Sequence, residues 1–214
     1  MSKLIIALDV VNIDAARHLI EQTCDYCELY KIGWPFFMAH GRVGIEKLYN
    51  EFNIDILFDV KFYDPPHTVS HTVALMPTYS GIKMFTVHRS MVAAAMMAKS
   101  TAQIIATVAL TSDNKTGKDI AFRAFSAIRQ GAAGVTCSGH AAKFVRDKID
   151  TGKLIICPGF RLDENSNDDH SKAVTLAEAS TMPEVNYWVV GRPIINSADP
   201  GNMAKIIASE IVQE

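Results

Sequence analysis

The segment that decides the fold is IDILFDVKFYD, residues 54–64; its first part, residues 54–62, is an apolar run that predicts a strand and is interrupted by charged side chains. Its core is hydrophobic on both faces, as expected of a parallel strand that is covered on both sides. Because alternate residues of a strand point the same way, Asp59 and Lys61 share one face, and Asp64 follows where the chain turns toward a helix. Burying an acid and a base on one strand face carries a desolvation cost. The pattern therefore indicates either a structural ion pair or a catalytic site.

Similar apolar, β-branched runs recur along the whole chain. The other predicted strands are residues 4–9, 28–33, 82–88, 103–110, 134–138, 153–159 and 187–192. Stretches of helical periodicity separate them, and the clearest are residues 12–23, 89–100, 115–130 and 200–213. Strands that alternate with helices predict βαβ units and a parallel sheet.

Two of these helices carry local signals. Asn12 is the expected N-cap of the first predicted helix. The helix at 115–130 is expected to bury one stripe, made of Ile120, Ala121, Phe125 and Ile128. We also expect core packing for the methionines Met91, Met96 and Met97.

Eight strand–helix units without an intervening linker predict one (β/α)8 TIM barrel domain spanning residues 1–214. The chain offers about 27 residues for each unit, which is tight but sufficient when the loops are short. An open doubly wound sheet is the alternative, but no GxGxxG motif follows the first predicted strand.

The composition excludes several classes of protein. The chain has 49% hydrophobic and 21% charged residues and a formal net charge of -2, which does not fit a disordered chain or a dedicated nucleic-acid binder. The sequence has no apolar run of the roughly 18 to 20 residues that a membrane helix needs, so we expect neither a nucleic-acid nor a membrane partner. Cys24 and Cys27 form a lone CxxC, and Cys137 and Cys157 lie in apolar runs. This cysteine usage favours ordinary thiols in a reducing cytoplasm.

Charged residues gather at the carboxyl ends of the predicted strands. These residues are Asp9, Lys31, Asp59 with Lys61, His88, Arg161 and Arg192. In a β/α barrel the carboxyl ends of the strands form the functional face, so the pattern predicts an active site for a small, charged ligand. Carboxylates beside Lys61 would hold its ammonium charged, and a positioned, protonated lysine is a general acid.

The last two strands are followed by a candidate phosphate site. One loop begins Pro158-Gly159-Phe160-Arg161, and the other contains Gly191-Arg192. Barrels commonly bind phosphate at these two loops, where glycine lets the backbone approach and arginine matches the phosphate oxygens. The first of these loops continues into a polar segment at about 160–172. This segment is long for a barrel loop and is expected to be a lid that closes on the phosphate.

Six motifs, in order along the chain, resemble the orotidine 5'-monophosphate decarboxylase family. They are ALD (7–9), YKIGWPFF (30–37), FDVKFYD (58–64), LTS (110–112), PGFR (158–161) and VVGRPI (189–194). The resemblance implies a β/α barrel that works as a homodimer, without metal or organic cofactor. It implies conversion of orotidine 5'-monophosphate to uridine 5'-monophosphate and CO2, in pyrimidine synthesis.

The resemblance also implies roles for individual residues. Lys61 would protonate the pyrimidine C6, and Asp59 would lie beside the substrate carboxylate. Asp9 and Lys31 would contact the ribose, and Asp64 and Thr68 would reach the partner's site in the dimer. The remaining implied substrate contacts are Thr111 and Ser112 at the pyrimidine, and Pro158, Gly159, Arg161, His170, Gly191 and Arg192 toward the phosphate.

Two departures and two alternatives accompany this resemblance. The loop Pro65-Pro66-His67 replaces the usual aliphatic-Pro-Asn, and His170 stands where a lid glutamine is usual. One alternative is an Mg²⁺-dependent sugar-phosphate decarboxylase or hexulose-phosphate synthase of the same superfamily, but Lys31 would repel the cation. The other is a barrel that binds a nucleotide without catalysing a reaction.

Overall fold

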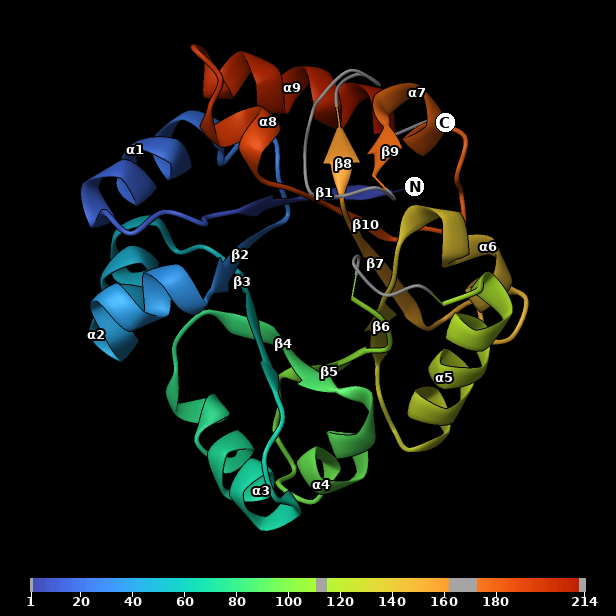
Figure 1. Cartoon of the computed structure of the whole chain (residues 1–214). Helices are drawn as coiled ribbons and strands as arrows, with labels where there is room; N and C mark the ends of the chain where they lie inside the picture. The colour runs from blue at the N-terminus through green and yellow to red at the C-terminus, as the bar shows by residue number, and fades with distance from the viewer. Residues whose placement is uncertain (1, 111–114, 162–172, 212–214) are drawn as a thin grey trace.

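The computed structural model describes residues 2–110, 115–161 and 173–211, and its centre is a closed barrel of eight parallel strands (Figure 1). Around the barrel the order is β1, β10, β7, β6, β5, β4, β3, β2, so that β1 closes the ring between β2 and β10. The bounds of these strands are β1 Lys3–Ala7, β2 Leu29–Gly33, β3 Ile56–Phe62, β4 Ile82–His88, β5 Gln103–Thr107, β6 Gly134–Thr136, β7 Leu154–Pro158 and β10 Tyr187–Val190. The predicted (β/α)8 fold is confirmed.

Helices form a ring outside the barrel (Figure 1). They are α1 Ile13–Thr23, α2 Trp34–Phe52, α3 Pro66–Ala74, α4 Val92–Met96, α5 Gly117–Arg129, α6 Gly139–Arg146, α7 Leu176–Ala179, α8 Arg192–Ile195 and α9 Pro200–Ile211, with 3₁₀ turns η1 Met76–Thr78 and η2 Arg89–Met91. Two short strands, β8 (Phe160–Arg161) and β9 (Val174–Thr175), pair with each other outside the barrel. No helix in these ranges is both long and apolar enough to cross a bilayer.

The core has two layers, as the strand pattern requires. Outward-facing strand residues such as Ile6, Ile32 and Phe58 pack with the helices in one large buried cluster. The inward-facing residues form a second, smaller cluster that fills the amino-terminal half of the barrel; it contains Ile5, Ala7, Leu29, Leu57, Met84, Ile105, Ile156 and Val189. Because each strand alternates its side chains, the next inward residue of each strand lies nearer the carboxyl ends, and there the lining becomes polar.

The expected N-cap is confirmed, and the expected stripe on α5 is partly wrong. The Asn12 side chain accepts hydrogen bonds from the backbone N–H groups of Asp14 (2.7 Å) and Ala15 (3.1 Å). Helix α5 does bury Ile120 and Ala121, but Phe125 is 45% exposed. The buried residues after Ala121 are Ala124 and Ala127. These small side chains let the helix lie close to the barrel, and they turn Phe125 toward solvent.

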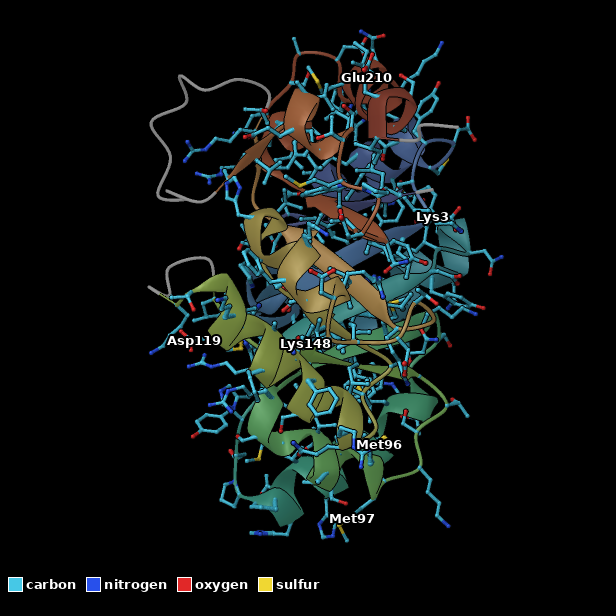
Figure 2. The ribbon with its side chains drawn as sticks, turned by 90° about the vertical axis from the view of Figure 1, so that its right-hand side faces the viewer. Lys3, Met96, Met97, Asp119, Lys148 and Glu210 are labelled. Carbon is cyan, nitrogen blue, oxygen red and sulfur yellow. The ribbon has the colours of Figure 1, made fainter. Side chains whose placement is uncertain are left out.

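The segment at 89–100 forms less helix than its composition predicts. It begins as η2, where Ser90 N–H donates to Nδ1 of His88, and α4 ends at Met96. Met97 is 76% exposed and Met96 44% exposed, so the expected core packing of these two methionines is wrong (Figure 2). Figure 2 views the barrel from the side, with Lys3 at the amino end of β1 and Asp119 in the first turn of α5 on opposite sides of the view.

Candidate active site

A cavity of about 560 Å³ opens at the carboxyl ends of the barrel strands. Its floor is the apolar cluster inside the barrel, represented by Leu57 and Ile156. Above that floor the lining includes eight residues named from the sequence: Asp9, Lys31, Asp59, Lys61, Pro158, Gly159, Gly191 and Arg192. Eight of the residues named from the sequence therefore lie together around one cavity.

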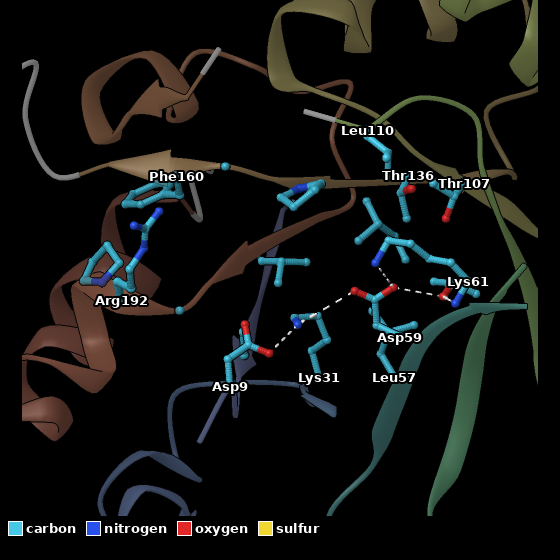
Figure 3. A pocket seen from close by; sticks show the side chains of 18 of the residues that line it. Asp9, Lys31, Leu57, Asp59, Lys61, Thr107, Leu110, Thr136, Phe160 and Arg192 are labelled. Atoms are coloured by element: carbon cyan, nitrogen blue, oxygen red, sulfur yellow. Dashed lines mark hydrogen bonds and ion pairs between the residues drawn. The ribbon is translucent and has the colours of Figure 1, made fainter. Parts of the chain in front are cut away.

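Four charged side chains form a row of alternating sign across the cavity (Figure 3). Lys31 Nζ donates to Oδ1 of Asp9 at 2.7 Å and lies 3.8 Å from Oδ2 of Asp59. Lys61 Nζ donates to Oδ1 of Asp59 at 2.8 Å. The row therefore reads carboxylate, ammonium, carboxylate, ammonium, and it ends at Lys61.

The row keeps Asp59 ionised. Burial of the Asp59 carboxyl acts to raise its pKa, but the charges of Lys61 and Lys31 and the hydrogen bonds from Lys61 and Thr86 outweigh it, so its pKa lies below the ordinary value. An ionised Asp59 in turn holds the ammonium of Lys61 beside it through their 2.8 Å hydrogen bond.

Lys61 has an unusual backbone conformation. Its φ is +50°, in the left-handed region that residues with a Cβ rarely adopt. Such a residue costs on the order of 1–3 kcal/mol, and strain of this kind gathers at functional sites. A β-bulge explains it: the register between β3 and β4 shifts between Phe58 and Phe62.

The opposite end of the cavity carries the glycines and Arg192. Figure 3 shows Arg192 on the far side of the cavity from Lys61, with Asp9 and Lys31 between them. Gly159 has φ +96°, and its carbonyl accepts a hydrogen bond from Val174 N–H at 2.9 Å, which ties the end of β7 to β9. A Cβ on Gly191 would come 3.4 Å from Cβ of Ala7, which is an ordinary van der Waals contact.

Other expected site residues do not line the cavity of this chain. Asp64 lies beyond the end of β3 and is exposed, and Thr68 lies in the first turn of α3. Arg161 lies in strand β8, paired with Thr175, and does not line the cavity. Thr111, Ser112, His170 and nearly all of the expected lid lie outside the described residues.

Three threonines of the lining were missed from the sequence. Thr86, Thr107 and Thr136 lie on the inner face of β4, β5 and β6, and all three are buried. Thr107 and Thr136 are register partners. A signal was present: each is a polar residue at an inward-facing position of an otherwise apolar strand. The hydroxyl of Thr107 has no hydrogen-bond partner within the described ranges, although its atoms are buried against the cavity.

The described residues give little support for a metal site or for a redox site at the CxxC pair. Over the described part of the chain, no three His, Cys, Asp or Glu side chains gather as a metal site would require. Burial raises the pKa of the Cys27 thiol to about 12, which makes it a poor nucleophile. The CxxC pair therefore does not fit a redox site.

A closed parallel barrel with a charged cavity at the carboxyl ends of its strands defines a TIM-barrel enzyme that acts on a small, charged molecule. The chain belongs to the Orotidine 5'-phosphate decarboxylase / HUMPS family, whose model matches residues 2–207.

Individual relatives agree with this family. An orotidine 5'-phosphate decarboxylase of Methylococcus capsulatus is 31% identical and covers 98% of this chain and 91% of its own length. One from Methylobacterium nodulans is 32% identical over 98% of this chain and 95% of its own length. Among solved structures, the orotidine 5'-phosphate decarboxylase of Lactobacillus acidophilus has a TM-score of 0.81 at 24% identity, covering 99% of both chains. This last likeness supports the fold.

Proposed function

We propose that this protein is an orotidine 5'-phosphate decarboxylase, converting orotidine 5'-phosphate into uridine 5'-phosphate and CO2 as a step of pyrimidine synthesis. The observation that carries the proposal is the row Asp9, Lys31, Asp59 and Lys61, which ends in a partly buried carboxylate with an ammonium hydrogen-bonded to it. The family match and the curated relatives support it.

The shape of the cavity suggests how the substrate lies. The phosphate would bind near Gly159, Gly191 and Arg192, since arginine and free backbone N–H groups suit phosphate oxygens. The ribose hydroxyls would meet Asp9 and Lys31 in the middle of the row. The pyrimidine would then place its C6 carboxylate beside Asp59 and Lys61, at the end of the cavity farthest from Arg192.

The reaction needs a charge that stabilises a carbanion. The bond between C6 and the carboxylate carbon breaks, CO2 leaves, and the electron pair stays on C6 in the plane of the ring, where the π system does not delocalise it. The Lys61 ammonium would stabilise this pair electrostatically and then transfer one proton from Nζ to C6. Nζ regains its proton from solvent, so atoms and charge balance over the cycle.

Asp59 would act in two ways. It holds the Lys61 ammonium at the reaction site through the 2.8 Å hydrogen bond. Its negative charge also lies where the substrate carboxylate would bind, and that repulsion is relieved when CO2 departs. The first contribution follows directly from the geometry.

The metal-dependent chemistry of the same family fits this cavity less well. In the free protein, the ammonium of Lys31 lies between the carboxylates of Asp9 and Asp59, in the position that a divalent cation would take between them. An ammonium at this position repels a cation, and it already neutralises the two carboxylates that would bind one. We therefore favour the decarboxylase over an Mg²⁺-dependent synthase, and a catalytic role over a barrel that only binds a nucleotide.

We further infer a single-domain chain that acts in the cytoplasm as a homodimer. Asp64 is exposed beyond the cavity, and Thr68 follows Asp64 along the chain at the start of α3. Each side chain could reach a second copy of this chain from there. Residues 160–172, with Arg161 and His170, would close over the phosphate, and Thr111 and Ser112 would meet the pyrimidine.

Loss of orotidine 5'-phosphate absorbance, followed with purified protein after exhaustive chelation, tests the proposal. We expect turnover that chelation leaves unchanged, and near-complete loss of turnover in Lys61→Ala. Absence of turnover by the wild-type protein at high concentration would overturn the proposal. Mg²⁺-dependent turnover of a sugar phosphate, with none of orotidine 5'-phosphate, would instead support the synthase-type chemistry.

A further inference from the structure

The β-bulge in β3 places three residues opposite one residue of β4. Phe58 pairs with Phe85 and Phe62 pairs with Val87, so Asp59, Val60 and Lys61 face Thr86 alone. A bulge leaves backbone groups without their usual partners from the neighbouring strand. The N–H of Lys61 is such a group, and a side chain satisfies it.

The Thr86 hydroxyl is that side-chain partner. Lys61 N–H donates to Oγ1 of Thr86 at 2.8 Å, and Thr86 Oγ1 donates its own hydrogen to Oδ1 of Asp59 at 2.9 Å. Because the backbone N–H of Lys61 occupies an acceptor position of the hydroxyl, the single hydroxyl hydrogen is directed to the carboxylate. Thr86 is fully buried, so water does not compete for these bonds.

These contacts close a ring of hydrogen bonds. The ring runs from the backbone of Lys61 through the Thr86 hydroxyl to Asp59, and from Asp59 back to Nζ of Lys61 at 2.8 Å. The strained backbone of the lysine is therefore tied to Thr86 and its ammonium to Asp59, and these two partners are bonded to each other. No other side chain of the described residues bonds to both members of the pair.

We propose that Thr86 is a positioning residue for the reaction: its hydroxyl holds the bulged backbone of Lys61 and the carboxylate of Asp59 in the relative positions that aim the Lys61 ammonium at C6. The proposal rests on the proposed function for its kinetic consequence. Its geometric content, a hydroxyl that links Lys61 to Asp59, stands independently of the substrate.

The rival interpretation is that Thr86 only fills space inside the barrel. A valine has the shape of threonine without the hydroxyl, so Thr86→Val would satisfy a space-filling role. Thr86→Ser keeps the hydroxyl and loses a methyl group, so it would satisfy the positioning role. The two substitutions therefore separate the two interpretations.

The kinetic experiment measures kcat and KM for orotidine 5'-phosphate over a pH series. In Thr86→Val we expect kcat to fall by about 10- to 100-fold, because small misplacements of a reacting group have effects of this size. KM should change by less than about threefold, since the groups proposed to bind the phosphate and ribose stay in place. Thr86→Ser should retain kcat within about threefold of the wild type. Thr151→Val, an exposed residue in the turn before β7, is the matched control and should behave as wild type.

The pH dependence of kcat adds a measurement that a loss of packing alone would not change. Asp59 loses a donor in Thr86→Val, so its pKa rises and the acidic limb of the kcat profile moves to higher pH. Wild-type kcat and an unmoved acidic limb in a folded Thr86→Val would overturn the proposal, as would equal losses in Thr86→Val and Thr86→Ser.

A substrate-free measurement separates this proposal from the proposed function. An NMR titration of the Asp59 carboxyl carbon should show a higher pKa in Thr86→Val than in the wild type, and a restored pKa in Thr86→Ser. If the wild type does not turn over orotidine 5'-phosphate, the proposed function fails. The NMR titration still decides whether Thr86 links Lys61 to Asp59. An unchanged Asp59 titration in Thr86→Val would overturn the link.

Discussion

Lys31 is hydrogen-bonded to Asp9, with 2.7 Å between Nζ and Oδ1, and it lies 3.8 Å from the nearer oxygen of Asp59. It is thus anchored by the outer carboxylate and acts on the inner one through its charge. The inner carboxylate is the one that holds Lys61. Lys31 therefore contributes to the electrostatics of the Asp59–Lys61 pair without bonding to Lys61.

Replacing Lys31 by Met should raise the pKa of Asp59, because one of the two charges that lower it is removed. We expect kcat/KM to fall by on the order of 100-fold and the acidic limb of its pH profile to move to higher pH. The pH profile of kcat/KM is the measurement, and Lys31→Arg, which keeps the charge, is the control. An acidic limb in the same place for Lys31→Met and wild type would contradict the prediction.

Asp59 should make stability depend on pH. Its folded pKa lies below the ordinary value of 3.8, so its ionised form stabilises the fold above that pH, and the contribution is lost as the pH falls through the folded pKa. Asp59→Asn should therefore be less stable than wild type at pH 7, and the difference should shrink as the pH falls below the ordinary carboxyl pKa of 3.8. Urea denaturation of both proteins across this range measures it. A difference that stays constant with pH would refute the assignment.

Thr107 offers a test of an unpaired hydroxyl. Thr107→Val removes a buried donor that has no partner in the described structure and keeps the side-chain shape. We expect the ligand-free protein to gain about 1 kcal/mol in free energy of unfolding, because the desolvation penalty of the hydroxyl disappears. Denaturant unfolding measures the change. A loss of stability would mean that the hydroxyl is satisfied. A rise in KM in the same variant would show that the substrate uses it.

The two cysteines of the CxxC should react at very different rates. Cys24 is exposed, whereas burial raises the pKa of Cys27 to about 12, so little of Cys27 is thiolate at pH 8. Cys137 and Cys157 are buried. Iodoacetamide should therefore label the native protein mainly once, at Cys24, as peptide mass analysis would show. Native Cys24→Ser should label slowly, and rapid labelling of it would contradict the burial of Cys27.

The sequence was sufficient for the barrel and for most of the charged row. Apolar runs with β-branched residues mark strands wherever both faces are buried, and the carboxyl ends of parallel strands must converge, so Asp9, Lys31, Asp59 and Lys61 could be placed together. Period-two alternation also placed Asp59 and Lys61 on one face.

The bulge and its consequences could not be read from the sequence. Whether β3 shifts its register against β4 depends on packing between two strands, and nothing within residues 54–64 encodes the partner. The positive φ of Lys61 and the role of Thr86 follow from that shift. Likewise, the exposure of Phe125 depends on how closely α5 approaches the barrel, and the short strand β8 depends on its pairing with β9, which takes Arg161 away from the cavity lining.

The apolar floor of the barrel limits how molecules enter and leave the site. Side chains such as Ile5, Leu57, Ile105 and Ile156 fill the barrel beneath the charged row, so the described barrel has no passage toward its amino end. Nucleotide, CO2 and water must therefore enter and leave through the one opening at the carboxyl ends of the strands. While the nucleotide occupies that opening, CO2 must pass around the nucleotide or remain in the cavity beneath it. The order in which products leave is thus a property of the barrel interior as well as of the chemistry.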